Sequence, residues 1–266
     1  MTAILHVSDT HFGTERPAVV DALVDLARAC EPELVLLGGD ITQRARPVQF
    51  ARAQRFVARL PAPVLAVPGN HDIPLFDVFT RLTAPYRRYC EAFGQQREAV
   101  YESDTVLAIG VDSTRAYRHK QGEVSRQQVE RVAGILARAR RGQLRIVLLH
   151  HPLVAAEEGD RKNLVRGRKY AMRVWSSMGA DLLLGGHIHL PYVAPLPMGA
   201  PHTWTVQAGT AVSSRVRSGI PNSVNLLKWL PKEDGMRACI VERWDYGGDA
   251  GFVLHTDRSL AIAPRA

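Results

Sequence analysis

Side chains that bind metal ions or move protons stand where short apolar runs of this sequence end. The run 63–67 is followed by a Pro-Gly pair and then by Asn70, His71 and Asp72. A short apolar run stopped by Pro-Gly predicts a buried strand that ends in a tight turn. This turn would present an amide oxygen, an imidazole and a carboxylate, although the same residues are also common in ordinary turns.

Four further apolar runs end in the same kinds of side chain. In chain order, these ends carry Asp9 with His11, Asp40, His150 with His151, and His187 with His189. Each residue alone has an ordinary structural explanation, such as capping a helix, filling the core or closing a turn. Their recurrence favours a shared site, because the carboxyl ends of parallel strands lie along one edge of a sheet, where ligands bind.

The chemistry of this set favours metal ions. Carboxylates, imidazoles and one amide oxygen, with no thiolate nearby, suit Mn²⁺, Fe²⁺ or Zn²⁺. Seven ligands, counted with one histidine of the 150–151 pair and without His71 and Asp72, are too many for one tetrahedral ion. They suit two ions about 4 Å apart that share a carboxylate. The expected cofactors are therefore two divalent transition-metal ions.

Alternating strands and helices would position these side chains. We expect strands at 3–7, 34–37 and 63–67, separated by helices at 17–30 and 47–60. Runs that are apolar on both faces are typical of a parallel sheet covered by helices. The pattern therefore predicts a β-α-β-α-β unit that ends in the turn described first.

The rest of the chain predicts two further groups of elements. The middle part begins with an expected helical segment 76–93, interrupted at Pro85, and a hairpin of strands 99–102 and 106–111. A Ser125–Gln128 capping box then predicts a helix that runs to about Arg141. The expected elements that follow are a strand 145–149, a basic loop 155–169, a helix 170–178 and a strand 181–184. After residue 190, the short segments 203–207, 223–230, 237–244 and 252–256 predict an antiparallel second sheet.

Length and composition limit the class of protein. A chain of 266 residues without a low-complexity linker predicts a single domain spanning 1–266. No apolar run approaches the roughly 20 residues that cross a bilayer, and no basic leader opens the chain, so we expect a cytoplasmic protein without a membrane partner. The 3 cysteines are far apart and odd in number, which fits free thiols in a reducing compartment.

The chain is basic, with 34 Lys and Arg against 26 Asp and Glu and a formal charge of +8. This balance suits an anionic substrate and makes nucleic acid a partner to consider. The densest patches, 138–145 and 161–173, lack the interleaved aromatic residues of a single-strand binding platform. Nucleic acid is therefore possible but not favoured, and the patches fit solvated faces and a field that steers a substrate.

Taken together, the motifs resemble the signature of the calcineurin-like metallophosphoesterases. The series reads Asp9-Thr10-His11, Gly39-Asp40, Gly69-Asn70-His71-Asp72, His150-His151-Pro152 and Gly186-His187-Ile188-His189. The resemblance implies a four-layer α/β/β/α sandwich in which two mixed sheets are flanked by helices. It also implies a metal-dependent phosphoric ester hydrolase that acts on a small anionic phosphoester.

The resemblance further implies a role for each residue of the series. The first metal would be held by Asp9, His11 and His189, the second by Asn70, His150 and His187, and Asp40 would bridge the two. His71 would be the catalytic histidine and Asp72 its orienting partner. His150 is preferred to His151 because the metal histidine of the family stands two residues before a proline, and a role for His151 near the substrate is left open.

The expected mechanism follows from charge. Two dications, two aspartates and a bridging hydroxide leave about +1 to bind a phosphate anion. The hydroxide would attack phosphorus, and His71, if protonated, would donate to the phosphoryl group or the leaving oxygen.

Departures from some branches of the family narrow the substrate. Residues 41–44 read Ile-Thr-Gln-Arg and the central motif ends in Asp72, which differs from the protein-phosphatase branch. The lipid A pathway hydrolases carry arginine where His71 stands. The sequence is most similar to the bacterial cyclic-nucleotide and glycerophosphodiester phosphodiesterases, so a phosphodiesterase for a 3′,5′-cyclic nucleotide is the leading prediction.

Three alternatives remain at this point. Two are a DNA or RNA nuclease and a phosphomonoesterase of the same superfamily, although no residues are left over for the capping domain that nucleases usually add. The third is a catalytically inert binding scaffold, which would be expected to have lost ligands that this chain retains.

Overall fold

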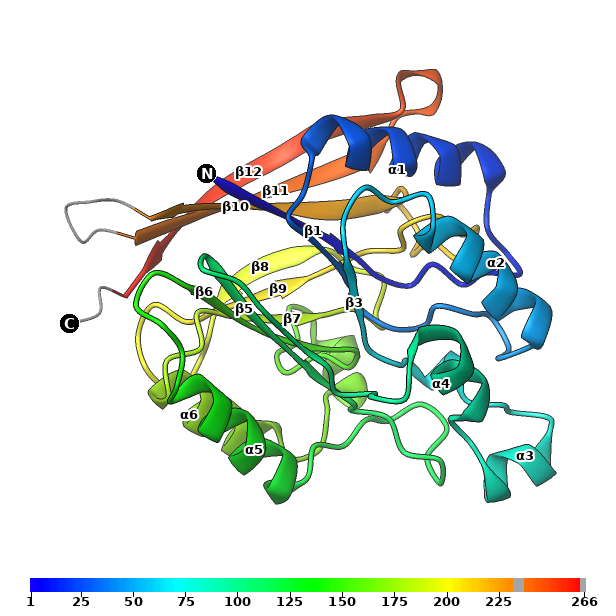
Figure 1. Cartoon of the computed structure of the whole chain (residues 1–266), viewed down its shortest axis with the longest axis horizontal. Coiled ribbons are helices and arrows are strands. Elements are labelled where there is room, and N and C mark those ends of the chain that lie inside the picture. Colours follow the sequence, from blue (N-terminus) through cyan, green and yellow to red (C-terminus); the bar gives the residue numbers. More distant parts are fainter. Residues whose placement is uncertain (232–236, 264–266) are drawn as a thin grey trace.

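A computed structural model describes residues 1–231 and 237–263, in which two stacked mixed sheets lie between layers of helices (Figure 1). The first sheet has the order β12-β11-β10-β1-β2-β3. Its strands are β1 (Thr2–Val7), β2 (Leu34–Leu37), β3 (Val64–Ala66), β10 (Ser223–Pro231), β11 (Arg237–Tyr246) and β12 (Phe252–Ile262). In this sheet β1, β2 and β3 are parallel, and β10 joins β1 in the antiparallel sense.

The second sheet has the order β4-β5-β6-β7-β9-β8. Its strands are β4 (Val100–Glu102), β5 (Val106–Val111), β6 (Leu144–Leu149), β7 (Leu182–Gly185), β8 (Tyr192–Pro195) and β9 (Trp204–Gln207). From β5 to β9 the neighbouring strands are parallel, and the edge strands β4 and β8 are antiparallel to their neighbours.

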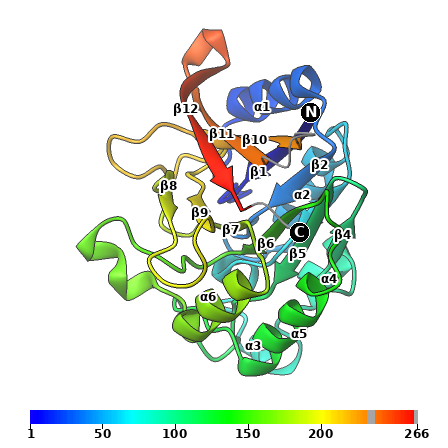
Figure 2. The same ribbon diagram turned by 90° about the vertical axis from the view of Figure 1, so that its left-hand side faces the viewer.

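Most of the helices cover the outer faces of the two sheets. The helices are α1 (Pro17–Cys30), α2 (Pro47–Val57), α3 (Val78–Thr83), α4 (Arg87–Phe93), α5 (Arg126–Leu136) and α6 (Arg168–Ser177), with short 3₁₀ turns at Asn70–Asp72, Glu158–Asn163 and Gly248–Ala250. Helix α3 lies at a corner of the molecule (Figure 1). Figure 2 shows the order of the layers, from α1 over the first sheet to α5 and α6 under the second.

Alternation along the strands explains the four layers. In β1, Ile4 packs in the apolar cluster between the sheets, whereas Leu5 and Val7 pack in the cluster beneath α1 and α2. In β6, Ile146 likewise faces the first sheet, and Val147 faces α5 and α6. Because successive side chains of a strand point to opposite faces, a strand covered on both faces is apolar throughout. The predicted α/β/β/α sandwich is confirmed.

The prediction of an antiparallel second sheet from the C-terminal strands is wrong. Strands β10, β11 and β12 extend the first sheet through β1, whereas β9 lies in the second sheet, parallel to β7. Strand β8 was not expected at all. The sequence pattern describes each strand but not its partner, because pairing depends on contacts far apart in the chain.

Smaller differences concern the ends of helices. Helix α5 ends at Leu136 rather than near residue 141, and the expected loop 155–169 contains a 3₁₀ turn and the first residues of α6. The capping box that opens α5 is confirmed, since the backbone N–H of Gln128 donates to Ser125 Oγ and that of Ser125 to Gln128 Oε1. No helix within the described residues is long and apolar enough to cross a membrane.

Candidate metal centre

The predicted site residues lie in loops that follow strands of both sheets. The loops after β1, β2 and β3 belong to the first sheet and carry Asp9, His11, Asp40, Asn70 and His71. The loops after β6 and β7 belong to the second sheet and carry the three remaining metal-ligand candidates, His150, His187 and His189. The expectation that all ends lie along one sheet is therefore corrected, because the stacked sheets bring two sets of carboxyl ends together.

Five of these residues have a left-handed backbone. Their φ angles are 54° at Asp9, 43° at His11, 47° at Asp40, 72° at His187 and 56° at His189. This region is costly for residues other than glycine, and such conformations persist where the surrounding structure imposes them, often at functional sites. The fold thus holds the loops in the shape that turns their side chains toward one another.

The glycine of the central turn allows two of these loops to touch. A Cβ atom added to Gly69 would lie 2.0 Å from the backbone nitrogen of Asp40 and 2.3 Å from its Oδ1. Backbone of one loop therefore passes directly against the carboxylate of the other, and only glycine leaves room for it.

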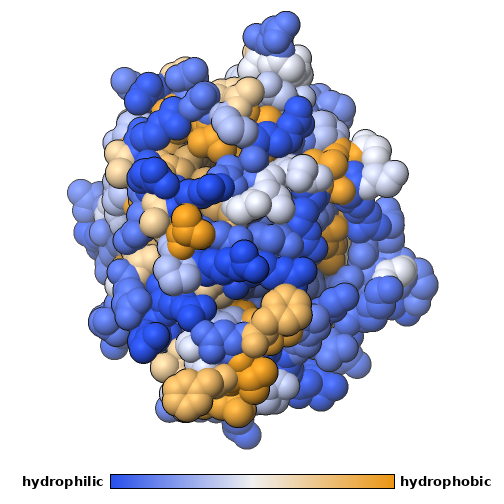
Figure 3. Space-filling model, turned by 90° about the vertical axis from the view of Figure 1, so that its right-hand side faces the viewer, coloured by the Kyte–Doolittle hydropathy of each residue, from blue (hydrophilic) through white to orange (hydrophobic). Residues whose placement is uncertain are grey.

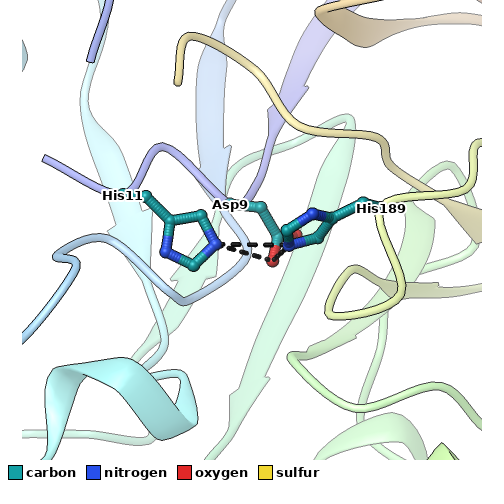
Figure 4. Close-up of side chains that lie close together, drawn as sticks. All are labelled: Asp9, His11 and His189. Atoms are coloured by element: carbon teal, nitrogen blue, oxygen red, sulfur yellow. Dashed lines mark hydrogen bonds and ion pairs between the residues drawn. The ribbon is translucent and has the colours of Figure 1, made fainter. Parts of the chain in front are cut away.

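Asp9, His11 and His189 form one cluster of possible ligands (Figure 4). Asp9 Oδ1 lies 3.2 Å from His189 Nε2 and 3.8 Å from His11 Nε2, and these two nitrogens are 3.2 Å apart. The other carboxylate oxygen of Asp9 accepts hydrogen bonds from Ser8 Oγ at 2.7 Å and from the backbone N–H of His187 at 3.0 Å. These bonds fix the carboxylate with Oδ1 turned to the two imidazoles.

Asp40, His150 and His187 form a second cluster. His150 Nε2 lies 3.3 Å from Asp40 Oδ1 and 3.3 Å from His187 Nδ1. Because the other ring nitrogen of His150 lies 2.8 Å from the carbonyl oxygen of Gly38, it carries the proton and donates there. In neutral His150 the lone pair of Nε2 therefore faces an anionic oxygen.

The carboxylate of Asp40 spans both clusters. Its Oδ2 lies 3.8 Å from His11 Nε2 in the first cluster, and its Oδ1 faces His150 in the second. The backbone N–H of His71 donates to Oδ1 at 2.8 Å and fixes the group. With one oxygen near each cluster, the carboxylate of Asp40 lies where it could bind two ions at once.

Unpaired buried acceptors test whether metal ions fit here. Among the residues that the structure describes, Asp9 Oδ1 and Asn70 Oδ1 are buried and have no hydrogen-bond partner. An unsatisfied buried polar atom costs about 1–3 kcal/mol, and more when it is charged. Cations between these oxygens and the imidazole lone pairs would satisfy them all, so the residues fit the metal ions.

In the metal-free protein, protons balance part of the negative charge. Burial would lower the pKa of His150, but the carboxylate of Asp40 outweighs burial and raises it to about 9. Asp9 similarly raises the pKa of His189 against the effect of burial. By contrast, burial lowers the pKa of His11 and of His187 to about 3, so both imidazoles are neutral at pH 7.

Both aspartates stay ionised although they are buried. Burial opposes ionisation, but the neighbouring histidines, His189 at Asp9 and His150 at Asp40, hold the pKa of each carboxyl well below its usual range. The charge of the cluster is therefore available to a cation at neutral pH.

His71 lies beside the clusters with its ring partly open to solvent. Its Nε2 is 4.0 Å from Asp40 Oδ2, and its Nδ1 is 2.9 Å from the carbonyl oxygen of Gln43. Since a carbonyl only accepts, Nδ1 carries a proton and Nε2 faces the mouth of the site. His71 is thus oriented by Gln43.

Asp72, predicted as the orienting partner of His71, makes its hydrogen bonds to backbone groups and to the hydroxyl of Thr42. Asp72 is buried and accepts hydrogen bonds from the backbone N–H groups of Ile41, Thr42 and Gly69 at 3.1, 2.7 and 2.9 Å. Burial and the charge of Asp40 raise the pKa of Asp72 to about 7, although these bonds act in the opposite direction. Asp72 joins the loops after β2 and β3, and it positions His71 through the segment that ends at Gln43.

Arg215 is a site residue that the sequence analysis missed. Its Nη1 lies 3.1 Å from His71 Nε2, 3.1 Å from Gln43 Oε1 and 3.4 Å from His11 Nδ1. No motif marks this arginine. Only its position in the sequence could have indicated it, because Arg215 follows β9 and the other candidate residues also follow parallel strands.

His151 lies outside both clusters. Its Nδ1 is 2.8 Å from Ser113 Oγ and its Nε2 is 3.0 Å from the carbonyl oxygen of Lys120. Both ring nitrogens are occupied by the protein, so His151 anchors the loop of Lys120 and has no nitrogen left for a metal or a substrate.

Comparison with known proteins agrees with this geometry. Residues 2–191 match the calcineurin-like phosphoesterase family. The chain is 26% identical over 204 residues to a probable cyclic nucleotide phosphodiesterase of Synechococcus sp., which covers 72% of this chain and 74% of that protein. It is 29% identical over 203 residues to a probable cyclic nucleotide phosphodiesterase of Rhodococcus erythropolis, covering 70% of this chain and 64%, just under two thirds, of that protein.

Among solved structures, a purple acid phosphatase from yellow lupin (Lupinus luteus) seeds has a similar fold. The TM-score is 0.72 at 12% identity, and the match covers 98% of this chain and 53% of the lupin chain.

Proposed function

The chain belongs to the calcineurin-like phosphoesterase family and is a metal-dependent phosphoric ester hydrolase, and we propose that it is a phosphodiesterase for a small diester, with a 3′,5′-cyclic nucleotide as the leading candidate. The observation that carries the proposal is the pair of clusters that share Asp40, with His71 and Arg215 at the same mouth. The names of the Synechococcus and Rhodococcus relatives support this choice of substrate.

In the proposed centre, each metal takes ligands from both sheets. The first metal would be held by Asp9, His11 and His189 and the second by Asn70, His150 and His187, and Asp40 would serve both. The oxygen and imidazole donors suit Mn²⁺, Fe²⁺ or Zn²⁺. When bound, two such ions lower the pKa of water, which makes it a nucleophile at neutral pH, and polarise phosphoryl oxygens.

The residues at the mouth complete the proposed chemistry. In this structure His71 Nε2 accepts from Arg215, since a guanidinium only donates and Nδ1 of His71 donates to Gln43. With Arg215 turned to the substrate, Nε2 would take up a proton and pass it to a phosphoryl or leaving oxygen. Arg215 presents a guanidinium, whose fork of N–H donors matches the oxygens of a phosphate. A diester carries one negative charge, and Arg215 would bind it beside His71 and the metals.

The experiment is a substrate comparison on purified protein loaded with Mn²⁺. The substrates are 3′,5′-cyclic nucleotides, glycerophosphodiesters, phosphomonoesters and single-stranded DNA. Turnover of cyclic nucleotides with the highest kcat/KM is the expected result. A higher kcat/KM for monoesters would reject the diester proposal.

Two further outcomes would assign the alternatives. Competition by polynucleotide, with affinity that falls steeply as salt rises, would assign a nuclease. Two bound metal ions without hydrolysis of any of the four substrate classes would assign an inert scaffold.

A further inference from the structure

Apolar side chains are exposed on α3 and the turn before it, at a corner of the molecule (Figure 1). We call Phe76, Val78, Phe79 and Leu82 the apolar rim, and their exposed fractions are 74%, 59%, 77% and 79%. Figure 3 shows apolar side chains gathered in the lower part of this face, below hydrophilic residues. A contiguous exposed apolar patch on a protein of this kind marks an interaction surface.

Polar contacts beneath the apolar rim hold it outward. Thr80 is the buried residue of α3, and its Oγ donates to Asp77 Oδ2 at 2.7 Å. Arg81 donates to the carbonyl oxygens of Pro74 at 3.0 Å and Arg118 at 2.7 Å. The helix therefore buries polar groups and exposes apolar ones, the reverse of an ordinary surface helix.

The apolar rim adjoins the mouth of the metal centre. The guanidinium of Arg44 lies 5.0 Å from the centre of the Phe76 ring. Arg44 directly follows Gln43, whose carbonyl oxygen accepts a hydrogen bond from Nδ1 of His71. A surface that covers the rim would therefore place its own groups beside the mouth.

The charge around the apolar rim is positive. Arg44, Arg81 and Lys120 have no carboxylate within salt-bridge distance in the part of the chain that the structure describes. Lys120 is exposed, and its loop is tied to His151 beside the metal centre. The acidic residue of the segment, Asp77, is already paired with Arg88 at 2.6 Å. Exposed apolar side chains flanked by basic ones are the combination that binds anionic lipid surfaces.

We propose that the apolar rim and the basic residues beside it dock the protein on an anionic membrane surface, with the mouth of the metal centre next to the lipid head groups. The aromatic and aliphatic side chains enter the interface, and Arg44 and Lys120 face the acidic head groups. This binding does not depend on the proposed substrate. It departs from the expectation of no membrane partner, which considered only segments that span a bilayer.

The experiment measures co-sedimentation with vesicles of phosphatidylglycerol and phosphatidylcholine at low salt. We expect the unmodified protein to bind them, and to bind pure phosphatidylcholine vesicles much more weakly. Phe79→Asp should weaken binding to the anionic vesicles about tenfold or more, because burial of one phenylalanine is lost and a like charge is added.

Leu254→Asp on β12 is the matched control. It adds the same charge at another exposed apolar residue, 49% exposed, on a different element. We expect it to change vesicle binding little, and both variants to keep their melting temperature and their rate on a water-soluble diester. Equal binding by Phe79→Asp and the unmodified protein would overturn the proposal, and so would absence of binding by the unmodified protein.

Failure of this experiment is distinguishable from failure of the proposed function. Vesicle binding is measured without turnover, and diester hydrolysis is measured without vesicles. If the unmodified protein does not bind vesicles but forms dimers that Phe79→Asp dissociates, the apolar rim is a contact between copies of this chain, and the membrane proposal is rejected.

Discussion

At the scale of single residues, the proposed centre divides side chains that hold metals from side chains that act on the substrate. Asp40 belongs to the first kind, because both its oxygens face imidazoles. His71 and Arg215 belong to the second, since each has nitrogens at the mouth and neither completes a cluster. Substitutions at these positions should therefore separate metal binding from turnover.

Replacing His71 by Ala should leave both metals bound and lower kcat about 10²-fold or more. The reason is that a positioned proton donor is lost while the ligands stay in place. Metal content by mass spectrometry and kcat on the preferred diester are the measurements. His255→Ala, at a histidine on β12 whose side chain is 52% exposed, is the control. Near-normal turnover of the His71 variant would show that another group supplies the proton.

Replacing Arg215 by Ala should raise KM for a diester about 10- to 100-fold, the scale of one charge-assisted hydrogen bond. Arg215→Lys should lose less, because it keeps the charge but not the planar fork. Steady-state kinetics on both variants tests this. Arg126→Ala, at an arginine whose side chain is 80% exposed, is the control for loss of a positive charge. An unchanged KM would mean that Arg215 only holds His71.

Metal affinity should rise with pH up to about 9. Since the pKa of His150 in the metal-free protein is raised to about 9, this ring is protonated at pH 7 and must release its proton to bind a cation. One released proton corresponds to about a tenfold gain in affinity per pH unit below the pKa. Calorimetric titration with Mn²⁺ at pH 6.5 and 7.5, in buffers of different ionisation enthalpy, measures this release. Equal affinities without proton release would contradict the assignment of His150.

At the scale of elements, loops that follow strands do the positioning, and Asp72 is the link between two of them. Its carboxylate accepts three backbone N–H groups and the hydroxyl of Thr42 at 2.9 Å, all from the loops after β2 and β3. Neither loop can move without breaking these bonds. Gln43, and with it His71, depends on this link.

Replacing Asp72 by Ala should destabilise the protein by about 3 kcal/mol, because buried donors lose their acceptor. It should also lower kcat more than it raises KM, since His71 loses its fixed support while the Arg215 contact to substrate remains. Urea unfolding and steady-state kinetics measure the two effects. Asp104→Ala, at an aspartate whose side chain is 93% exposed, is the control. A kcat equal to that of the unmodified protein would show that Asp72 has no part in positioning His71.

The sequence predicts elements well where their signals are local. The apolar runs of β1, β2, β5 and β6, the Ser125 capping box and the break near Pro85 are each encoded within a few residues. The pairing of β10 with β1 joins residues more than 200 positions apart, such as Ile4 and Leu227, and no local pattern specifies it. Arg215 could not be predicted as a site residue for the same reason, because it comes close to His71 only when β9 and β3 lie in their sheets.

The candidate site residues could be selected from the sequence because the side chains that bind metals are few in kind and here follow apolar runs. The structure brings six of the seven ligand candidates together in two clusters and leaves the seventh, Asn70, with a buried amide oxygen that has no partner. It separates His151 from His150 by giving both nitrogens of His151 protein partners. The contacts of Asp72 could not be read from the sequence, because the spacing of Asp72 and His71 does not say which backbone groups surround the carboxylate.

At the scale of the whole molecule, the proposed metals join the two sheets. The first site takes Asp9 and His11 from loops of the first sheet and His189 from a loop of the second. The second site takes Asp40 from the first sheet and His150 and His187 from the second. Without cations, Asp9 Oδ1 and Asn70 Oδ1 in this region are buried without a hydrogen-bond partner, whereas the layer between the sheets is a cluster of buried apolar side chains.

Metal binding should therefore stabilise the whole fold and not only the loops. At a free metal concentration 100 times Kd, one site adds about 2.7 kcal/mol to the free energy of unfolding. Thermal unfolding with Mn²⁺ and then with excess chelator measures the shift, and the unmodified protein should melt several degrees lower without metal. Asp40→Ala should abolish this shift entirely because both sites lose a ligand, whereas Asp104→Ala should keep it. A full metal-dependent shift in the Asp40 variant would mean that the two sites bind independently, and that the shared carboxylate does not couple them across the sheets.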